Sequence, residues 1–417
     1  MPPAAVTPEE SLLREALDLA AQTDVRLIGR EPLGAGTVAG FEVHDSSDPL
    51  IYYVDTSRRA VERETGLAAA EATDPEVRVW LHPADPHLPA LAPLAFAHAA
   101  ETLLARLGMH ALGVPEIVAY RPGRRAVLRV PTDAGDVWVK AVPPARAPRL
   151  AATHDVLSRA GIPLPELLGW SDRGVLALAS AVGAPVAAVL GHAGAAGDAH
   201  EADVRADALL DEVDRLRSAF AGTALHAPAR TRMRRRLEWY AERLAATEHP
   251  GRTATVRALR DRTLARWGRS ESAVIHGDLH FGQLFVDAGG AITGVIDVDT
   301  AGVGDPADDP AAFIAHAVAS AVLTPQPRGA GVWRLAERAL ARWAGDPGMG
   351  DRVAARTTTH LLGHALGAVE AGEADRAALL LGAADAVLTG DLAALSSTRD
   401  GADDAPKSRL TAPLDRV

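Results

Sequence analysis

The chain has 417 residues, which exceeds one typical hydrophobic core, and it has no cysteine, which excludes disulfides, thiolate metal sites and thiol nucleophiles. Its formal net charge of −11 argues against nucleic acid as a partner. No apolar run reaches membrane-spanning length and the first residues lack the basic start of a signal peptide, so we expect a cytoplasmic protein without a membrane partner.

Residues 1–92 are predicted to form an N-terminal cap subdomain. Its pattern indicates a helix over 9–21 and short strands over 25–29, 41–44, 51–54 and 77–81. The glycine-rich stretch 34–40 is similar to a nucleotide loop, but its third glycine comes one position late for the dinucleotide fingerprint. We therefore predict a hairpin turn there, and a linker over the proline-punctuated residues 82–93.

Three strands are predicted next, over 116–120, 126–130 and 136–142, with turn residues between them. The third strand carries Lys140, the only lysine before position 407 in a chain that otherwise uses arginine. A lysine is a compact point charge that arginine does not replace, which suits phosphate binding. The structural alternative is a solvated lysine on an edge strand.

The segment Val274–Gln283 carries the most informative pattern. A short apolar strand leads into the run His276-Gly277-Asp278-Leu279-His280, and the amide of Gln283 follows five positions after Asp278. Residues 284–286 and 292–296 are predicted to pair as a hairpin, which ends at Asp297.

These groups are those that phosphoryl transfer from ATP requires. Asp278 is the candidate catalytic base, and His276 is expected to brace its loop by hydrogen bonds to backbone carbonyls. Gln283 supplies a neutral oxygen and Asp297 an anionic one, which together suit Mg²⁺. The alternative is that both aspartates are ordinary loop and cap residues. Asp299 is interpreted as supporting this site without binding the metal.

The run 276–283, together with Ile296-Asp297-Val298-Asp299 and Gly304-Asp305-Pro306, resembles the signature of the aminoglycoside phosphotransferase and choline kinase superfamily. Gln283 replaces the asparagine of most members, as in the bacterial maltokinase and glucosamine kinase branch. The resemblance implies an α+β, bilobal protein-kinase-like fold, with a small antiparallel-sheet N-lobe and a mostly helical C-lobe. The expected domains are a cap subdomain over 1–92, an N-lobe over 93–182, a C-lobe over 183–395 and a disordered tail over 396–417.

The resemblance also implies the nucleotide site. Lys140 would bind the ATP phosphates, the turn at 121–125 would cover them with Arg124 adding charge, and the backbone near Ala179 and Ala181 would meet the adenine. The glutamate expected to pair with Lys140 is absent, which leaves Asp155 as the candidate partner.

The remainder of the C-lobe is predicted to be helical, with apolar stripes that form its core. His280 is either a substrate-side residue or a loop residue bound to backbone. His360 and His364 have a spacing that could hold a metal, but a structural role is preferred because no third ligand is evident. The acids of the segment 370–375 are interpreted as surface residues, and those at 305, 308 and 309 as structural residues that open a helix over 311–322.

The sequence thus predicts an ATP- and Mg²⁺-dependent kinase that phosphorylates a hydroxyl of a small sugar or amino-sugar substrate. Three alternatives remain. One is an aminoglycoside antibiotic O-phosphotransferase. Another is a nucleotide-binding pseudokinase regulator, favoured by Gln283 and the missing glutamate. The third is a protein kinase, disfavoured because no activation segment is recognisable between Asp299 and Asp309.

Overall fold

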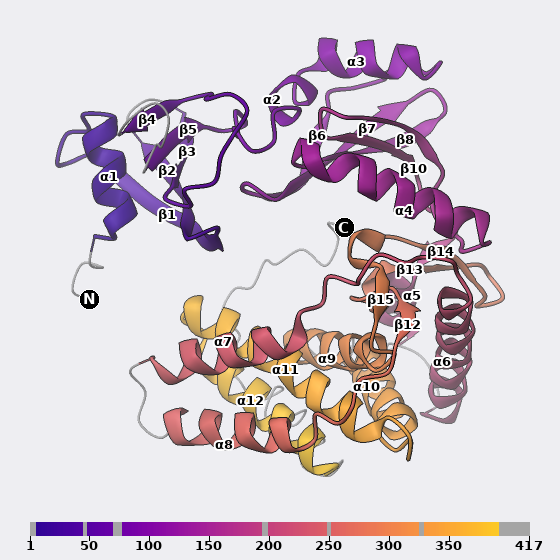
Figure 1. Ribbon diagram of the computed structural model, residues 1–417. Helices are drawn as coiled ribbons and strands as arrows, with labels where there is room; N and C mark the ends of the chain where they lie inside the picture. Colours follow the sequence, from indigo (N-terminus) through magenta and orange to yellow (C-terminus); the bar gives the residue numbers. More distant parts are fainter. Residues whose placement is uncertain are drawn as a thin grey trace. The chain divides into compact units, whose positions relative to one another are not determined.

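The structure is a computed structural model that describes residues 6–44, 48–69, 77–193, 199–247, 252–324 and 329–391. The chain divides into two compact units, and Figure 1 shows the elements of each. Among the described residues, the first unit contains those from 6 to 152 and from 166 to 180, and the second contains those from 153 to 165 and from 181 to 391. The predicted domain boundaries at 92 and 182 remain predictions, and the expected tail over 396–417 lies outside the described residues.

A five-stranded antiparallel sheet, in the order β1-β2-β3-β5-β4, forms the cap subdomain of the first unit. Helix α1 (Pro8–Ala16) packs on it and begins where the Thr7 side chain accepts a hydrogen bond from the backbone N–H of Glu10. Gly34 lies in the turn between β1 and β2 with a φ of +57°, so the hairpin predicted for the glycine-rich stretch is confirmed. The strands are β1 (Asp24–Leu33), β2 (Gly36–His44), β3 (Leu50–Asp55), β4 (Leu67–Ala69) and β5 (Val77–Leu81).

A second five-stranded antiparallel sheet, in the order β6-β7-β8-β10-β9, completes the first unit. The three strands predicted before residue 143 are confirmed, and Lys140 lies on β8 between β7 and β10 with only 9% of its surface exposed. It is therefore not an edge lysine. The strands are β6 (Glu116–Arg121), β7 (Arg125–Thr132), β8 (Gly135–Ala141), β9 (Leu167–Ser171) and β10 (Val175–Ala179); the helices are α2 (Leu91–Leu94), α3 (Ala97–Arg106) and the 3-10 turn η1 (Pro144–Arg146), followed by α4 (Ala147–Arg159).

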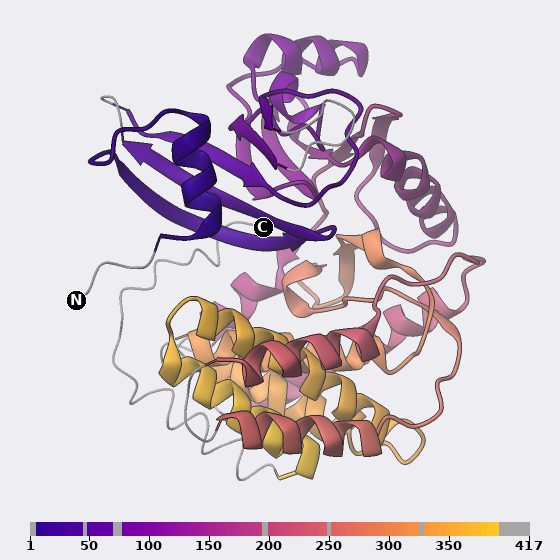
Figure 2. The ribbon, with the colours of Figure 1, turned by 60° about the vertical axis from the view of Figure 1, so that its left-hand side comes forward.

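The second unit is mostly helical, as expected for a C-lobe, so the α+β class is confirmed. In the turned view of Figure 2 its helices run side by side, with α11 packed against α9 and α12. The helices are α5 (Val186–Ala193), α6 (Ala199–Ala221), α7 (Met233–Ala245), α8 (Arg252–Ala265), α9 (Asp308–Leu323), α10 (Gly329–Trp343), α11 (Gly350–Glu370) and α12 (Ala374–Thr389).

Two small sheets lie among these helices. Strands β13 (Leu284–Val286) and β14 (Ile292–Val295) form the predicted hairpin, with β11 (Ala184–Pro185) added at its edge. Strand β12 (Ala273–Ile275) pairs with β15 (Gly302–Gly304). The residues proposed for catalysis and metal binding follow β12 or flank the hairpin.

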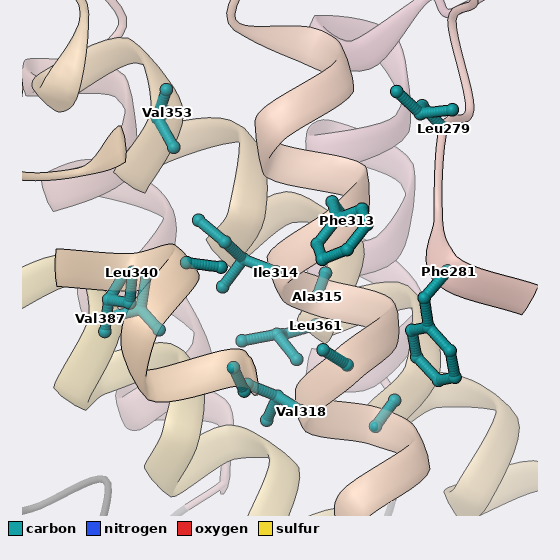
Figure 3. Close-up of a cluster of buried hydrophobic side chains, with 14 of the residues drawn as sticks. Leu279, Phe281, Phe313, Ile314, Ala315, Val318, Leu340, Val353, Leu361 and Val387 are labelled. Carbon is teal, nitrogen blue, oxygen red and sulfur yellow. The ribbon is translucent and has the colours of Figure 1, made fainter. Parts of the chain in front are cut away.

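Helix α9 runs through the core of the second unit. Phe313, Ile314 and Val318 are fully buried and pack among side chains of α10, α11 and α12, including Leu361 (Figure 3). Helices that are apolar on all sides are buried in this way. The helix begins three residues before the predicted start at 311, because Asp308, Asp309 and Pro310 form its first turn. None of the helices in the described ranges is long and apolar enough to cross a membrane.

Asp85 joins the cap subdomain to the second sheet of the first unit. Its carboxylate is buried and accepts hydrogen bonds from the Tyr120 hydroxyl at 2.9 Å and from the backbone N–H of Gly123 at 2.7 Å. The other oxygen accepts from the backbone N–H of His87 at 2.8 Å. All three donors would lose their partner if this carboxylate were removed.

We predict that Asp85→Ala lowers the melting temperature of the first unit by several degrees. Buried donors left without a partner cost about 1–3 kcal/mol each. Calorimetric melting tests this, with Asp24→Ala at an exposed position as the matched control. Equal melting curves for the two variants would show that the Asp85 contacts contribute nothing measurable.

Candidate active site

The catalytic loop, residues 276–283, is held by a buried carboxylate on α9. Asp309, 1% exposed, accepts hydrogen bonds from the backbone N–H of His276 at 2.9 Å and of Gly277 at 2.7 Å. The Thr300 hydroxyl donates to the carbonyl of His276 at 2.9 Å. Gly277 has a φ of +85°, and a Cβ there would lie 3.0 Å from the Thr300 carbonyl oxygen, so this position requires glycine.

His276 is completely buried beneath the loop. Its Nε2 lies 3.1 Å from the carbonyl oxygen of Ile296, and its ring meets the edge of Phe220. This is the contact to a backbone carbonyl expected from the sequence. This contact joins the loop after β12 to the residue that follows β14. The segments that carry Asp278 and Asp297 are thereby held at a fixed separation.

Asp278 is the candidate base, and 37% of its side chain is exposed. The surrounding protein desolvates it and raises the pKa of its carboxyl to about 6; the nearby Asp297 and Asp309 also raise this pKa, while His276 and Arg236 lower it. A carboxylate with this pKa holds a proton more strongly than an ordinary aspartate, which suits a group that accepts one during the reaction.

Gln283 and Asp297 lie at the same end of the β13–β14 hairpin, because Leu284 pairs with Val295. Gln283 is buried, and its Oε1 accepts a hydrogen bond from the backbone N–H of His280 at 3.3 Å. Asp297 adopts a left-handed backbone with a φ of +62°, a strained conformation of the kind that concentrates at functional sites. One amide and one carboxylate oxygen fit a magnesium ion that also takes phosphate oxygens and water as ligands.

Of the other predicted residues, Lys140, Arg124 and Ala179 lie in the first unit, Asp155 lies on α4, and Ala181 lies in the second unit. Lys140 lies opposite Val127 and Leu176 in the middle of the second sheet. The Ala179 backbone N–H donates to the carbonyl of Glu166 at 2.9 Å, and Ala181 follows two positions later, after β10 ends. Asp155 forms its ion pair with Arg159, at 2.9 Å on an exposed part of α4.

Arg124 contacts the cap subdomain. Its guanidinium donates to the carbonyl of Pro32 and lies 3.6 Å from the Glu31 carboxylate, which also binds Arg121 at 2.8 Å. Gly123, in the same turn, meets Leu33 where a Cβ would be added. The charge of Arg124 is therefore partly balanced within the first unit.

Sequence reasoning missed two residues of this site. Asp309 was expected only to open a helix, although it also holds the catalytic loop. His316 was not singled out; its Nε2 lies 3.9 Å from Asp278 Oδ1. The one signal that marks it is an imidazole on α9, where most other residues are apolar.

A family model for a phosphotransferase enzyme family matches residues 117–352, more than half of the chain. The chain belongs to this family. The match covers all predicted site residues from Arg124 to Asp297. By its family, the chain is a phosphotransferase enzyme. Among proteins with curated descriptions, none matches it.

Several solved structures are similar to this phosphotransferase. An apo thermostable mutant of aminoglycoside phosphotransferase APH(4)-Ia is 16% identical, with 70% of this chain and 98% of that chain covered and a TM-score of 0.49. A macrolide 2′-phosphotransferase type I is 17% identical, with 68% and 94% covered and a TM-score of 0.42. A choline/ethanolamine kinase family protein from Mesorhizobium loti is 16% identical, with 71% and 94% covered and a TM-score of 0.41.

We predict that Asp309→Asn lowers kcat about 10- to 100-fold and changes the KM for nucleotide little. The amide retains one acceptor but turns an NH₂ group toward the second backbone N–H, so the catalytic loop loses about 1–3 kcal/mol of support. Steady-state kinetics measure this, and a melting curve reports folding. The matched control is Asp351→Asn, which changes an exposed aspartate in the first turn of α11. Wild-type turnover by a folded Asp309→Asn enzyme would contradict the role of Asp309.

Proposed function

We propose that this phosphotransferase is an ATP-dependent kinase that transfers the γ-phosphate to a hydroxyl of a sugar or amino sugar. The observation that carries the proposal is Asp278: a half-buried carboxylate with its pKa raised to about 6, on a loop held from behind by Asp309. A base fixed in this way is positioned before the acceptor arrives, which lowers the entropic part of the barrier.

In the proposed reaction the acceptor hydroxyl donates a hydrogen bond to Asp278. The hydroxyl oxygen forms a bond to the γ-phosphorus as the bond from that phosphorus to the β-phosphate oxygen breaks, and Asp278 takes the hydroxyl proton. ADP leaves with the bonding electrons and the carboxyl later returns its proton to water. Gln283 and Asp297 would hold Mg²⁺, which when bound neutralises phosphate charge.

Lys140 would bind the ATP phosphates as a point charge, and the backbone at Ala179 and Ala181 would meet the adenine. The position of Lys140 inside the sheet, where its side chain is little exposed, supports this assignment. The compact ammonium group of a lysine suits a phosphate group.

Release of ADP from Mg-ATP tests the proposal, with glucosamine, other hexoses, maltose and aminoglycosides as acceptors. Stimulation by one sugar establishes the activity and its substrate class. Stimulation by aminoglycosides alone would replace the proposal with an antibiotic O-phosphotransferase. Tight ATP binding in calorimetry without stimulation by any acceptor would favour a pseudokinase regulator.

We predict that Asp278→Asn lowers kcat by at least about 100-fold while the affinity for Mg-ATP changes less than about twofold. The amide is similar in shape but cannot accept the proton, and general base catalysis contributes about 10²- to 10⁴-fold. Asp287→Asn, in the exposed turn of the β13–β14 hairpin, is the matched control. Wild-type turnover by the Asp278→Asn variant would show that Asp278 is not the catalytic base.

The pKa of Asp278 predicts the pH dependence. Only the ionised carboxylate accepts a proton, so kcat/KM is expected to be constant above about pH 6 and to fall about tenfold for each pH unit below it. The measurement is kcat/KM for the acceptor from pH 5 to 9, because this quantity reports the pKa of the free enzyme. Mg-ATP binding over the same range is the control, since phosphate groups titrate nearby. A kcat/KM that stays constant to pH 5 would contradict this prediction.

A further inference from the structure

A cluster of four histidines lies beside Asp278 in the second unit. His280 comes from the catalytic loop, His316 from α9, and His360 and His364 from α11. The rings of His280 and His316 stack with centroids 4.1 Å apart and an interplanar angle of 14°. His316 also meets the edge of His364 at 4.9 Å and lies 6.3 Å from His360. His316 is therefore the centre of the cluster.

Packing alone does not explain this cluster. Imidazoles carry polar nitrogens that cost free energy when they are placed among apolar groups. All four side chains keep part of their surface exposed, 27% for His316, although most neighbouring positions on α9 are fully buried. The cluster is thus partly exposed next to the candidate base. No group of three or more His, Cys, Asp or Glu in the described part of the chain has the arrangement of a metal site.

The charges around the cluster are not those of a site for a polycation. The pKa of His316 is lowered to about 4 and that of His364 to about 3, both mainly by burial, so both rings are neutral at physiological pH. Arg236 acts on His360 and on Asp278, and Arg376, which is paired with Glu373 at 2.7 Å, acts on His364. Two carboxylates lie near the cluster: Asp278, 3.9 Å from His316, and Asp297, which acts on His280; the proposed reaction already uses both.

We propose that the histidine cluster is the wall that binds the phosphoryl acceptor, and that it selects an uncharged hydroxylated ring over a polycationic one. This inference rests on the proposed function and narrows it. A neutral imidazole both donates and accepts hydrogen bonds, as a hydroxyl does, and its flat face packs against the apolar face of a sugar ring. Recognition of several ammonium groups requires carboxylates instead, and nearby guanidinium groups oppose it.

Kinetics of His316→Gln, His316→Phe and His364→Gln test this wall. We expect each to raise the acceptor KM about tenfold and to change the KM for Mg-ATP less than about twofold, because the proposed wall binds the acceptor and not the nucleotide. His316→Phe keeps the flat ring and His316→Gln keeps the polar group, so the pair separates stacking from hydrogen bonding. His226→Gln, at an exposed position of the same unit, is the control.

The charge selectivity is tested with glucose and glucosamine, which differ by one amino group, and with one aminoglycoside. The wild-type enzyme should have a kcat/KM at least about tenfold higher for the uncharged hexose. A higher kcat/KM for the amine-bearing compounds would contradict the proposed selection of an uncharged acceptor.

A titration of the unaltered protein with acceptor, followed by the NMR signals of the histidine rings, does not depend on any variant or on turnover. If the cluster signals shift and the His226 signal does not, the result supports acceptor binding by the histidine cluster. This holds even where no ADP is released and the proposed function fails. Two results contradict acceptor binding by the histidine cluster and leave the proposed function intact. One is turnover of an uncharged sugar with unshifted cluster signals. The other is such turnover with an unchanged acceptor KM in the His316 and His364 variants.

Discussion

The candidate active site depends on one buried carboxylate. Asp309 accepts two backbone hydrogen bonds from the catalytic loop, and it lies in the first turn of α9, where unpaired backbone N–H groups and the helix dipole favour negative charge. Arg356 from α11 reinforces this region by binding Asp305 at 2.6 Å and Asp308 at 2.7 Å. The loop with the candidate base is thereby fastened to the core of the second unit.

This attachment has an electrostatic consequence. Removal of these acids from water raises the pKa of Asp308 to about 6, although Arg356 lowers it, and the charge of Asp309 adds to the burial that raises the pKa of Asp278. The group that positions the catalytic loop thus also adjusts the base on it. Burial is the main cause of the raised pKa of Asp278, and Asp309, which holds the loop by two backbone hydrogen bonds, adds to it.

The parts of this arrangement that follow local rules could be predicted from the sequence. The β13–β14 hairpin, the strand that carries Lys140 and the contact of His276 with a backbone carbonyl follow from apolar runs, turn residues and motif spacing. The roles of Asp309 and His316 could not be predicted in this way, because each depends on a contact between segments more than 30 residues apart in the chain. Periodicity identifies the buried faces of α9 but does not indicate which loop lies against its first turn.

The cap subdomain also makes contacts that local sequence rules do not predict. Asp85 and Glu31 bind the turn between β6 and β7 at Tyr120, Arg121 and Gly123, in contacts that no local pattern marks. A turn with one glycine cannot wrap phosphates with backbone N–H groups as a glycine-rich loop does. Here its conformation is fixed from outside by two carboxylates of the cap subdomain. An ordered turn loses less entropy when a nucleotide binds than a flexible loop does. The cap subdomain is thus linked by direct contacts to the strand pair that precedes Lys140.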